Sequence, residues 1–234
     1  MARVALVRGP QVLPVSAMPA SQGVPSIGIA YLAGSLKAAG HTVFVIDAFG
    51  EAVNRFRRLG DTGLLINGLN ASETVDRVPS DVDIVGVSCM YSNEWLYSKV
   101  LIQAMVGRFP HVPVIAGGEH VTADAEYSLR SCTGLACVVL GEGEETLVQL
   151  VQHVEEGRPL TSGVNGIAFL SATGRLETAP PRARIRNVDD IPLPSWEETP
   201  LENYLSNGLG MASMRGRNMP MLASRGCPFK CTFC

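Results

Sequence analysis

The stretch Asp83-Ile84-Val85-Gly86-Val87-Ser88 decides the fold. It is a short, almost wholly apolar run rich in β-branched residues, which is typical of a strand buried on both faces. Similar runs occur at four other places in the first 140 residues: Val4–Val7, Thr42–Ile46, Val112–Ala116 and Cys137–Leu140. Helical periodicity separates several of them, over Ile27–Ala39, 92–108, Thr122–Arg130 and Glu144–Glu155.

Alternation of buried strands with helices predicts an α/β fold with a parallel sheet covered on both faces. Five strands fit a flavodoxin-like (Rossmann-like), doubly wound sheet in the order 2-1-3-4-5, which binds ligands beyond the carboxyl ends of its strands. Glu51–Leu59 fits a helix less clearly, and residues 60–70 are mixed.

Composition excludes several classes of protein. Of the 234 residues, 46% are hydrophobic and 18% are charged, so a buried core is expected and disorder is not. A formal charge of -3 gives no reason to expect nucleic acid or a membrane surface as a partner. Because residues 1–30 show no signal peptide and no window resembles a membrane span, we expect a soluble, cytoplasmic protein.

The character of the chain changes after the fifth helix. We expect residues 1–156 to form the α/β domain. Residues 157–220 should form a hairpin (Ile167–Leu170 with Leu176–Thr178) and a proline-rich linker draped over a surface. Residues 221–234 should open a further domain with a strand at Met221–Ser224.

The chain ends in Arg225-Gly226-Cys227-Pro228-Phe229-Lys230-Cys231-Thr232-Phe233-Cys234. The spacing of Cys227, Cys231 and Cys234 is C-x3-C-x2-C, and such a cluster in a cytosolic chain indicates metal binding. Three thiolates leave one iron of a [4Fe–4S] cluster open to a cofactor. The alternative is a zinc site, but zinc normally takes four protein ligands.

This motif resembles that of the radical S-adenosylmethionine (radical SAM) family, and Phe233 fills the position of the family's aromatic residue. The resemblance implies a [4Fe–4S] cluster, S-adenosylmethionine, and a partial (β/α) barrel whose first strand is Met221–Ser224. On this interpretation the barrel is truncated in the present chain, which would lack the catalytic part.

The strand ends resemble the cobalamin-binding domain found before many radical SAM domains. Ser88-Cys89-Met90 matches its Ser-x-Leu element, with Met90 in place of leucine, and Gly117-Gly118 matches its Gly-Gly element. In the family these two elements flank the nucleotide tail of cobalamin. The resemblance and the strand-end positions give these expected cofactor contacts: Arg8, Gly9, Ser88, Cys89, Met90, Gly117, Gly118, Gly141, Glu142, Gly143 and Glu144.

Each side chain among them also has a simpler interpretation. Arg8 could pair on the surface, and Cys89 is expected to contact a ligand through its backbone only. Glu142 and Glu144 could interact with the N-terminus of the fifth helix. His120 is expected to cap a helix rather than bind a ligand, and His153 to be solvated.

One departure concerns the cobalt ion. Cobalamin domains of the methionine synthase type carry Asp-x-His-x-x-Gly after the first strand, and its histidine ligates cobalt. Residues 1–40 contain no histidine, so the lower axial face of cobalamin should be open or water-bound.

The resemblance implies an enzyme that uses a 5'-deoxyadenosyl radical and methylcobalamin to methylate an unactivated carbon of a small molecule. An electron donor such as a flavodoxin or ferredoxin would serve it. One alternative is a cobalamin-binding module without activity as a fragment. Another is a radical enzyme of cyclase or rearrangement type whose α/β domain does not bind cobalamin.

Overall fold

The central sheet of the computed structural model, which describes residues 1–16, 23–210, 216–227 and 229, has seven strands. From one edge to the other they are β3 (Thr42–Asp47), β1 (Arg3–Arg8), β6 (Ile84–Ser88), β7 (Val114–Gly117), β8 (Leu135–Val139), β9 (Ile167–Leu170) and β10 (Leu176–Thr178). The first five are parallel, which confirms the predicted order 2-1-3-4-5.

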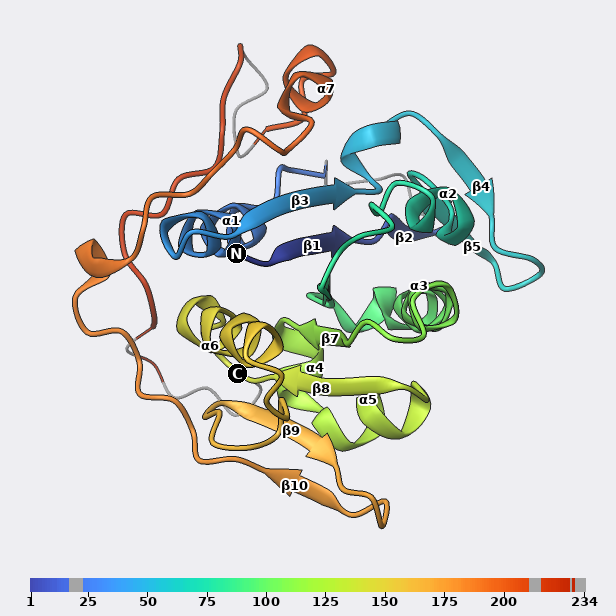
Figure 1. The fold of residues 1–234 in the computed structure, drawn as a ribbon. Coiled ribbons are helices and arrows are strands. Elements are labelled where there is room, and N and C mark those ends of the chain that lie inside the picture. The colour runs from blue at the N-terminus through green and yellow to red at the C-terminus, as the bar shows by residue number, and fades with distance from the viewer. Residues whose placement is uncertain (17–22, 211–215, 228, 230–234) are drawn as a thin grey trace.

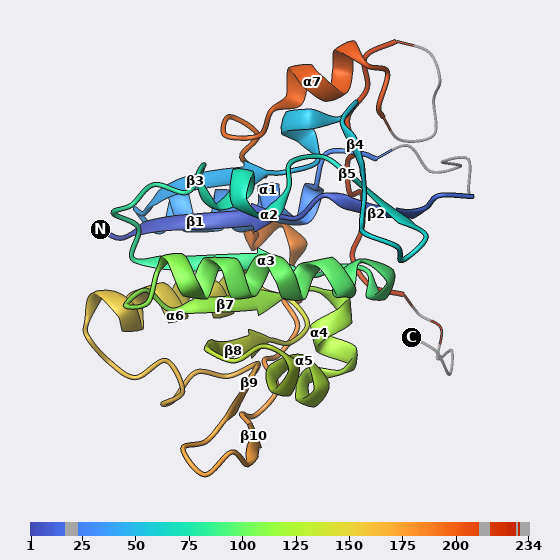
Figure 2. The same ribbon diagram turned by 90° about the vertical axis from the view of Figure 1, so that its right-hand side faces the viewer.

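Helices cover both faces of this sheet (Figures 1 and 2). One face carries α1 (Ile27–Ala38) and α6 (Glu144–Glu155), and the other carries α2 (Ala71–Val75), α3 (Trp95–Arg108), α4 (Glu119–Ala123) and α5 (Ala125–Ser131). Helix α1 begins at Ser26, whose side chain accepts a hydrogen bond from Ile29 N. Its end is set by Gly40, which has a positive φ of 88°.

The core has two layers because side chains alternate across a strand. In β1, Val4 and Leu6 pack toward α1 and α6, whereas Ala5 and Val7 pack toward α3. All four are buried, which accounts for the unbroken apolar run in the sequence.

A second, antiparallel sheet lies beyond the carboxyl end of β1 (Figure 2). It consists of β2 (Gln11–Pro14), β5 (Leu64–Asn67) and β4 (Phe56–Arg58). The possible helix over Glu51–Leu59 is wrong. A 3-10 turn at Gly50–Ala52, whose Gly50 N–H bonds the Asp47 carboxylate, leads into β4 instead.

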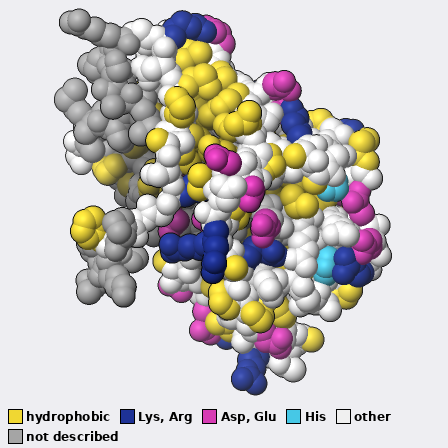
Figure 3. Space-filling view, turned by 90° about the vertical axis from the view of Figure 1, so that its left-hand side faces the viewer, with side chains coloured by type: hydrophobic (Ala, Val, Ile, Leu, Met, Phe, Trp, Pro, Cys, Tyr) yellow, Lys and Arg dark blue, Asp and Glu magenta, His cyan; other side chains and the backbone are white. Residues whose placement is uncertain are grey.

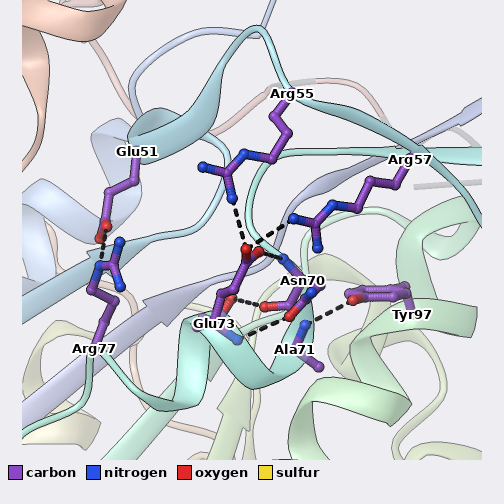
Figure 4. A network of polar contacts seen from close by, with 9 residues as sticks. Glu51, Arg55, Arg57, Asn70, Ala71, Glu73, Arg77 and Tyr97 are labelled. Carbon is purple, nitrogen blue, oxygen red and sulfur yellow. Dashed lines mark hydrogen bonds and ion pairs between the residues drawn. The ribbon is translucent and has the colours of Figure 1, made fainter.

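A polar network ties this small sheet to α2 (Figure 4). Glu73 accepts hydrogen bonds from Arg55 and Arg57 and forms a capping box with Asn70. The Tyr97 hydroxyl of α3 accepts from Ala71 N at 2.8 Å. The start of α2 is therefore held by its own capping box and by groups from β4 and α3.

The predicted hairpin joins the main sheet, because β9 pairs antiparallel with β8. The segment after it contains a 3-10 turn at Val188–Asp190 and α7 (Leu201–Ser206), which packs beside the Gly50–Ala52 turn. We call residues 180–220 the connecting segment. The strand predicted at Met221–Ser224 is wrong: these residues pair with no strand of the described chain, and Met221 is 85% exposed. In the described part, no helix is long and apolar enough to cross a membrane.

Candidate cofactor-binding edge

The predicted contacts gather at the carboxyl edge of the parallel sheet. Arg8 pairs in register with Ser88, and Ser88 pairs with Gly117. Gly117 in turn lies beside Val139, just before Gly141. Residues far apart in the sequence therefore share one edge, as the parallel order requires.

Small residues at this edge face α1 and α6. Gly86, Ser88 and Gly117 alternate with side chains that pack on the α3 face, so they point to the α1 and α6 side. A Cβ on Gly117 would come no closer than 3.7 Å to Val139 Cβ, and one on Gly141 would meet nothing within 4 Å. A methyl-sized atom would therefore fit at either position without a clash.

Gly118 is required by the backbone. Its φ is 116°, and a Cβ there would lie 2.6 Å from Cys89 O. This close approach is held by hydrogen bonds from Cys89 N to Gly117 O and from His120 N to Cys89 O. The second glycine of the pair thus joins the ends of β6 and β7, whereas a Cβ on the first would meet only Val139.

The two residues after Ser88 differ in exposure: Cys89 is buried, whereas Met90 is exposed. Cys89 is buried, and burial raises the pKa of its thiol to about 12, so it stays protonated at neutral pH. Met90 is 46% exposed at the edge. A ligand at this edge would meet the Met90 side chain, whereas the Cys89 side chain faces the core.

Arg8 is occupied by protein groups. Its guanidinium donates to Val24 O at 2.7 Å and to the Tyr204 hydroxyl at 2.8 Å, and it lies 3.6 Å from the Asp47 carboxylate. The Tyr204 hydroxyl donates to Asp47 at 2.5 Å, and its ring contacts Phe49 edge-on. The surface pair suggested for Arg8 is therefore wrong, since its partners are buried protein groups. Its contact with a cofactor stays a prediction.

The loop before α6 binds the later part of the chain. Glu142 accepts from Ile185 N at 3.0 Å, and the Glu144 carboxylate lies 2.6 Å from the Arg225 guanidinium. Gly143 is the N-cap of α6, and a Cβ there would lie 3.2 Å from Leu32 Cδ2 of α1. Gly143 has no side chain to cap α6, and Glu144 lies in the first turn of the helix, as the alternative expected. Glu142 and Glu144 also bind the segment beyond residue 180, and their contacts with a cofactor stay predictions.

Two predictions about histidines are wrong. His120 lies within α4 with its ring stacked 4.5 Å from that of Trp95, and its Nδ1 is 2.9 Å from Ser92 Oγ. Burial lowers its pKa. His153 is 1% exposed rather than solvated, and its Nδ1 is 2.9 Å from Pro159 O. Both rings face the interior because their helices turn those positions toward the core.

The predicted metal ligands are only partly described. Cys227 is an exposed free thiol, while Cys231 and Cys234 lie outside the described residues. Within residues 1–16, 23–210, 216–227 and 229, no three His, Cys, Asp or Glu side chains cluster as a metal site. The cysteine motif remains a prediction from sequence.

Two surface hollows lie away from the edge. One, of about 540 Å³, is lined by the C-terminal half of α1 and by residues 192–197, on the side shown in Figure 3. Because α1 runs antiparallel to the strands, its C-terminus is near their amino ends. The other, of about 240 Å³, lies beside the β9–β10 hairpin. Neither is lined by a predicted contact.

Comparison with known proteins matches residues 18–151 to the family model of the B12 binding domain. An uncharacterized methyltransferase of Pyrococcus horikoshii is 33% identical over 90% of the chain and 40% of its own length. The anaerobic magnesium-protoporphyrin IX monomethyl ester cyclase of Rubrivivax gelatinosus is 29% identical over 90% of the chain and 34% of its own length. The chain thus spans well under half of these relatives.

The fold resembles that of one part of a solved enzyme. The cobalamin-dependent S-adenosylmethionine radical enzyme OxsB, solved with aqua-cobalamin and S-adenosylmethionine bound, superposes with a TM-score of 0.61. The match has 18% identity and covers 83% of the chain and 24% of OxsB. At that identity the likeness establishes the α/β architecture.

Proposed function

The chain belongs to the B12-binding domain family, and from that premise we propose that it binds cobalamin at the carboxyl edge of its sheet for a radical SAM methyltransferase. The substrate would be an unactivated carbon of a small molecule or natural-product intermediate. Bound cobalamin would supply a methyl carrier. The similarity to a methyltransferase over 90% of the chain supports this reaction type.

The observation that carries the proposal is the set of small residues that ends at Gly117. Gly86 and Ser88 of β6, and Gly117 of β7 beside Ser88, are small on the α1 and α6 side, whereas the strand positions between them are filled by core side chains. Stability alone does not favour glycine inside a strand, since it leaves nothing to pack. A ligand that approaches the backbone closely accounts for these residues.

We propose that Cys227, Cys231 and Cys234 hold a [4Fe–4S] cluster whose open iron takes S-adenosylmethionine. The sequence spacing supports this set. Such a cluster needs one electron for each cleavage, so a flavodoxin or ferredoxin is the proposed partner. The buried free thiols of Cys89 and Cys137 support the reducing cytoplasm as the compartment.

Ring closure is the second candidate reaction. A cyclase is 29% identical over nearly the same length of the chain, so the B12-binding part does not separate the two reactions. Product analysis of the complete enzyme distinguishes them: methylation adds one carbon atom to the product, whereas ring closure adds none.

Cobalamin retention tests the proposed binding edge. The chain is incubated anaerobically with hydroxocobalamin, desalted, and measured by UV–visible spectroscopy. We expect wild type to retain cobalamin with a base-off spectrum, because the nucleotide tail would lie between the Ser88 and Gly117 elements rather than on cobalt. No histidine of residues 1–40 is present to replace it as a ligand.

Two variants compare a substitution at the carboxyl edge of the sheet with one on the exposed side of α3. Gly117→Val fills the space beside Val139 without a backbone clash and should abolish retention. Gly107→Val, on the exposed side of α3 where a Cβ meets nothing within 4 Å, is the matched control and should retain cobalamin. A folded wild-type chain that retains no cobalamin, or equal retention in both variants, would contradict the proposed site.

A further inference from the structure

Arg225 is bound to the B12-binding domain just before the cysteine motif. It precedes Cys227 by two residues, yet its side chain is only 18% exposed. Its guanidinium lies 2.6 Å from the carboxylate of Glu144, which is 8% exposed at the first position of α6. A nearly buried pair at this distance has the strength of a charge-assisted hydrogen bond, unlike an exposed ion pair.

The same guanidinium also contacts α1. Its carbon lies 4.7 Å from the centre of the Tyr31 ring, a cation–π distance. Helices α1 and α6 touch where Gly143 approaches Leu32, at the ends that adjoin the carboxyl edge of the sheet. Arg225 therefore spans two helices beside the predicted cobalamin contacts.

A second contact brings the connecting segment to the same loop. Glu142 accepts a hydrogen bond from Ile185 N, so both acidic residues of Glu142-Gly143-Glu144 bind the chain beyond residue 180. Arg184 is also near, since its Nη1 would lie 3.8 Å from a Cβ on Gly226. The chain just before Cys227 is thus held at Arg225 and passes close to the connecting segment.

We propose that Arg225 is a positioning residue that holds the chain just before the cysteine motif on α1 and α6, with Glu144 and Tyr31 as its seat. The seat lies at the end of α6 that adjoins the carboxyl edge of the sheet, where Ser88 and Gly117 pair. This inference rests on the proposed function for its purpose, because the cluster and cobalamin would then be held at a set separation. The contacts themselves are independent of any cofactor.

Limited trypsin digestion of the 234-residue chain tests the seat without a cofactor. Trypsin must bind the Arg225 side chain to cleave after it, so the pair with Glu144 should protect this bond. The peptide bond after Arg217 is the internal reference. The Arg217 side chain is 59% exposed, and its ion pair is with the exposed Glu202. The measured quantity is the cleavage rate at Arg225 divided by that at Arg217.

Glu144→Gln should raise this ratio about tenfold, the size expected for losing a hydrogen bond between charged groups. Glu145→Gln is the matched control. Glu145 is the neighbouring residue, 55% exposed and paired with Arg182, so the ratio should stay at the wild-type value. Glu144→Asp keeps the carboxylate and should restore most of the protection. Tyr31→Leu, which leaves both charges, should raise the ratio about threefold.

If thermal melts show both variants folded, equal Arg225-to-Arg217 cleavage ratios in Glu144→Gln and Glu145→Gln would contradict the proposed role of Glu144. Digestion with hydroxocobalamin present then tests the location. Retained cobalamin should slow cleavage after Arg225 and leave Arg217 unchanged. Retention without such protection would overturn the claim that the seat faces the ligand edge. A chain that retains no cobalamin would refute the proposed function, while the two glutamate variants still decide the seat.

Discussion

Replacing Tyr204 by Phe should destabilise the protein strongly, although only one oxygen atom is removed. Tyr204 is fully buried, and its hydroxyl donates to Asp47 while accepting from Arg8. The ring remains against Phe49, so little packing is lost. What changes is that two buried charged groups each lose a hydrogen bond.

The magnitude follows from these two bonds. A hydrogen bond to a charged group contributes about 1.5–3 kcal/mol, and the Arg8–Asp47 pair at 3.6 Å remains to offset part of the loss. We expect the free energy of unfolding to fall by about 2–4 kcal/mol. For a chain of this size that lowers Tm by roughly 10 °C. Burial and the Asp47 charge raise the pKa of Tyr204 far above its ordinary value, so the effect should not vary between about pH 6 and pH 9.

Thermal unfolding followed by circular dichroism measures this effect, with urea unfolding as a second assay. Tyr127→Phe is the control, because Tyr127 is 47% exposed and its substitution should change stability by less than about 0.5 kcal/mol. A Tyr204→Phe variant that melts within about 1 °C of wild type would refute the reasoning, since the buried charges would then not need the hydroxyl.

Three further changes test other parts of the fold. Gly118→Ala should lower the free energy of urea unfolding by about 2–4 kcal/mol, because a Cβ at φ 116° would strike Cys89 O. Gly107→Ala should leave stability unchanged or raise it, and similar losses in both variants would contradict this. Burial lowers the pKa of His120, so its contribution to stability is complete above about pH 6.5 and is lost as pH falls below it. His120→Gln should therefore lose less stability than wild type between pH 7 and pH 5, and parallel unfolding curves would count against this. Glu73→Ala removes the capping box and should lower the free energy of unfolding by about 1 kcal/mol, whereas Glu73→Gln keeps an acceptor oxygen and should lower it less. An equal fall in Tm for the two variants would exclude the capping box as the cause.

Local patterns predicted the elements that depend on local physics. The apolar runs at Val4–Val7 and Asp83–Val87 are strands because both of their faces are buried, and α6 begins and ends at the predicted residues Glu144 and Glu155. The parallel order also predicted that Ser88 and Gly117 share one edge, and the two residues pair in register there. The 3-10 turn and β4 were missed because the hydrogen bond from Gly50 N to the Asp47 carboxylate and the pairing of β4 with β5 leave no periodic signal.

The sequence by itself therefore determined the parallel sheet, its order and the glycines at its carboxyl edge, since periodicity and backbone freedom are properties of neighbouring residues. Only the tertiary structure decided the partners of the charged residues. Arg8 meets Tyr204 across 196 positions, and Glu144 meets Arg225 across the connecting segment. Several oppositely charged residues along the chain could pair with such a side chain, and the local sequence does not select one of them. Burial selects the partner, because a desolvated charge is tolerated only where an opposite charge or a hydrogen bond meets it.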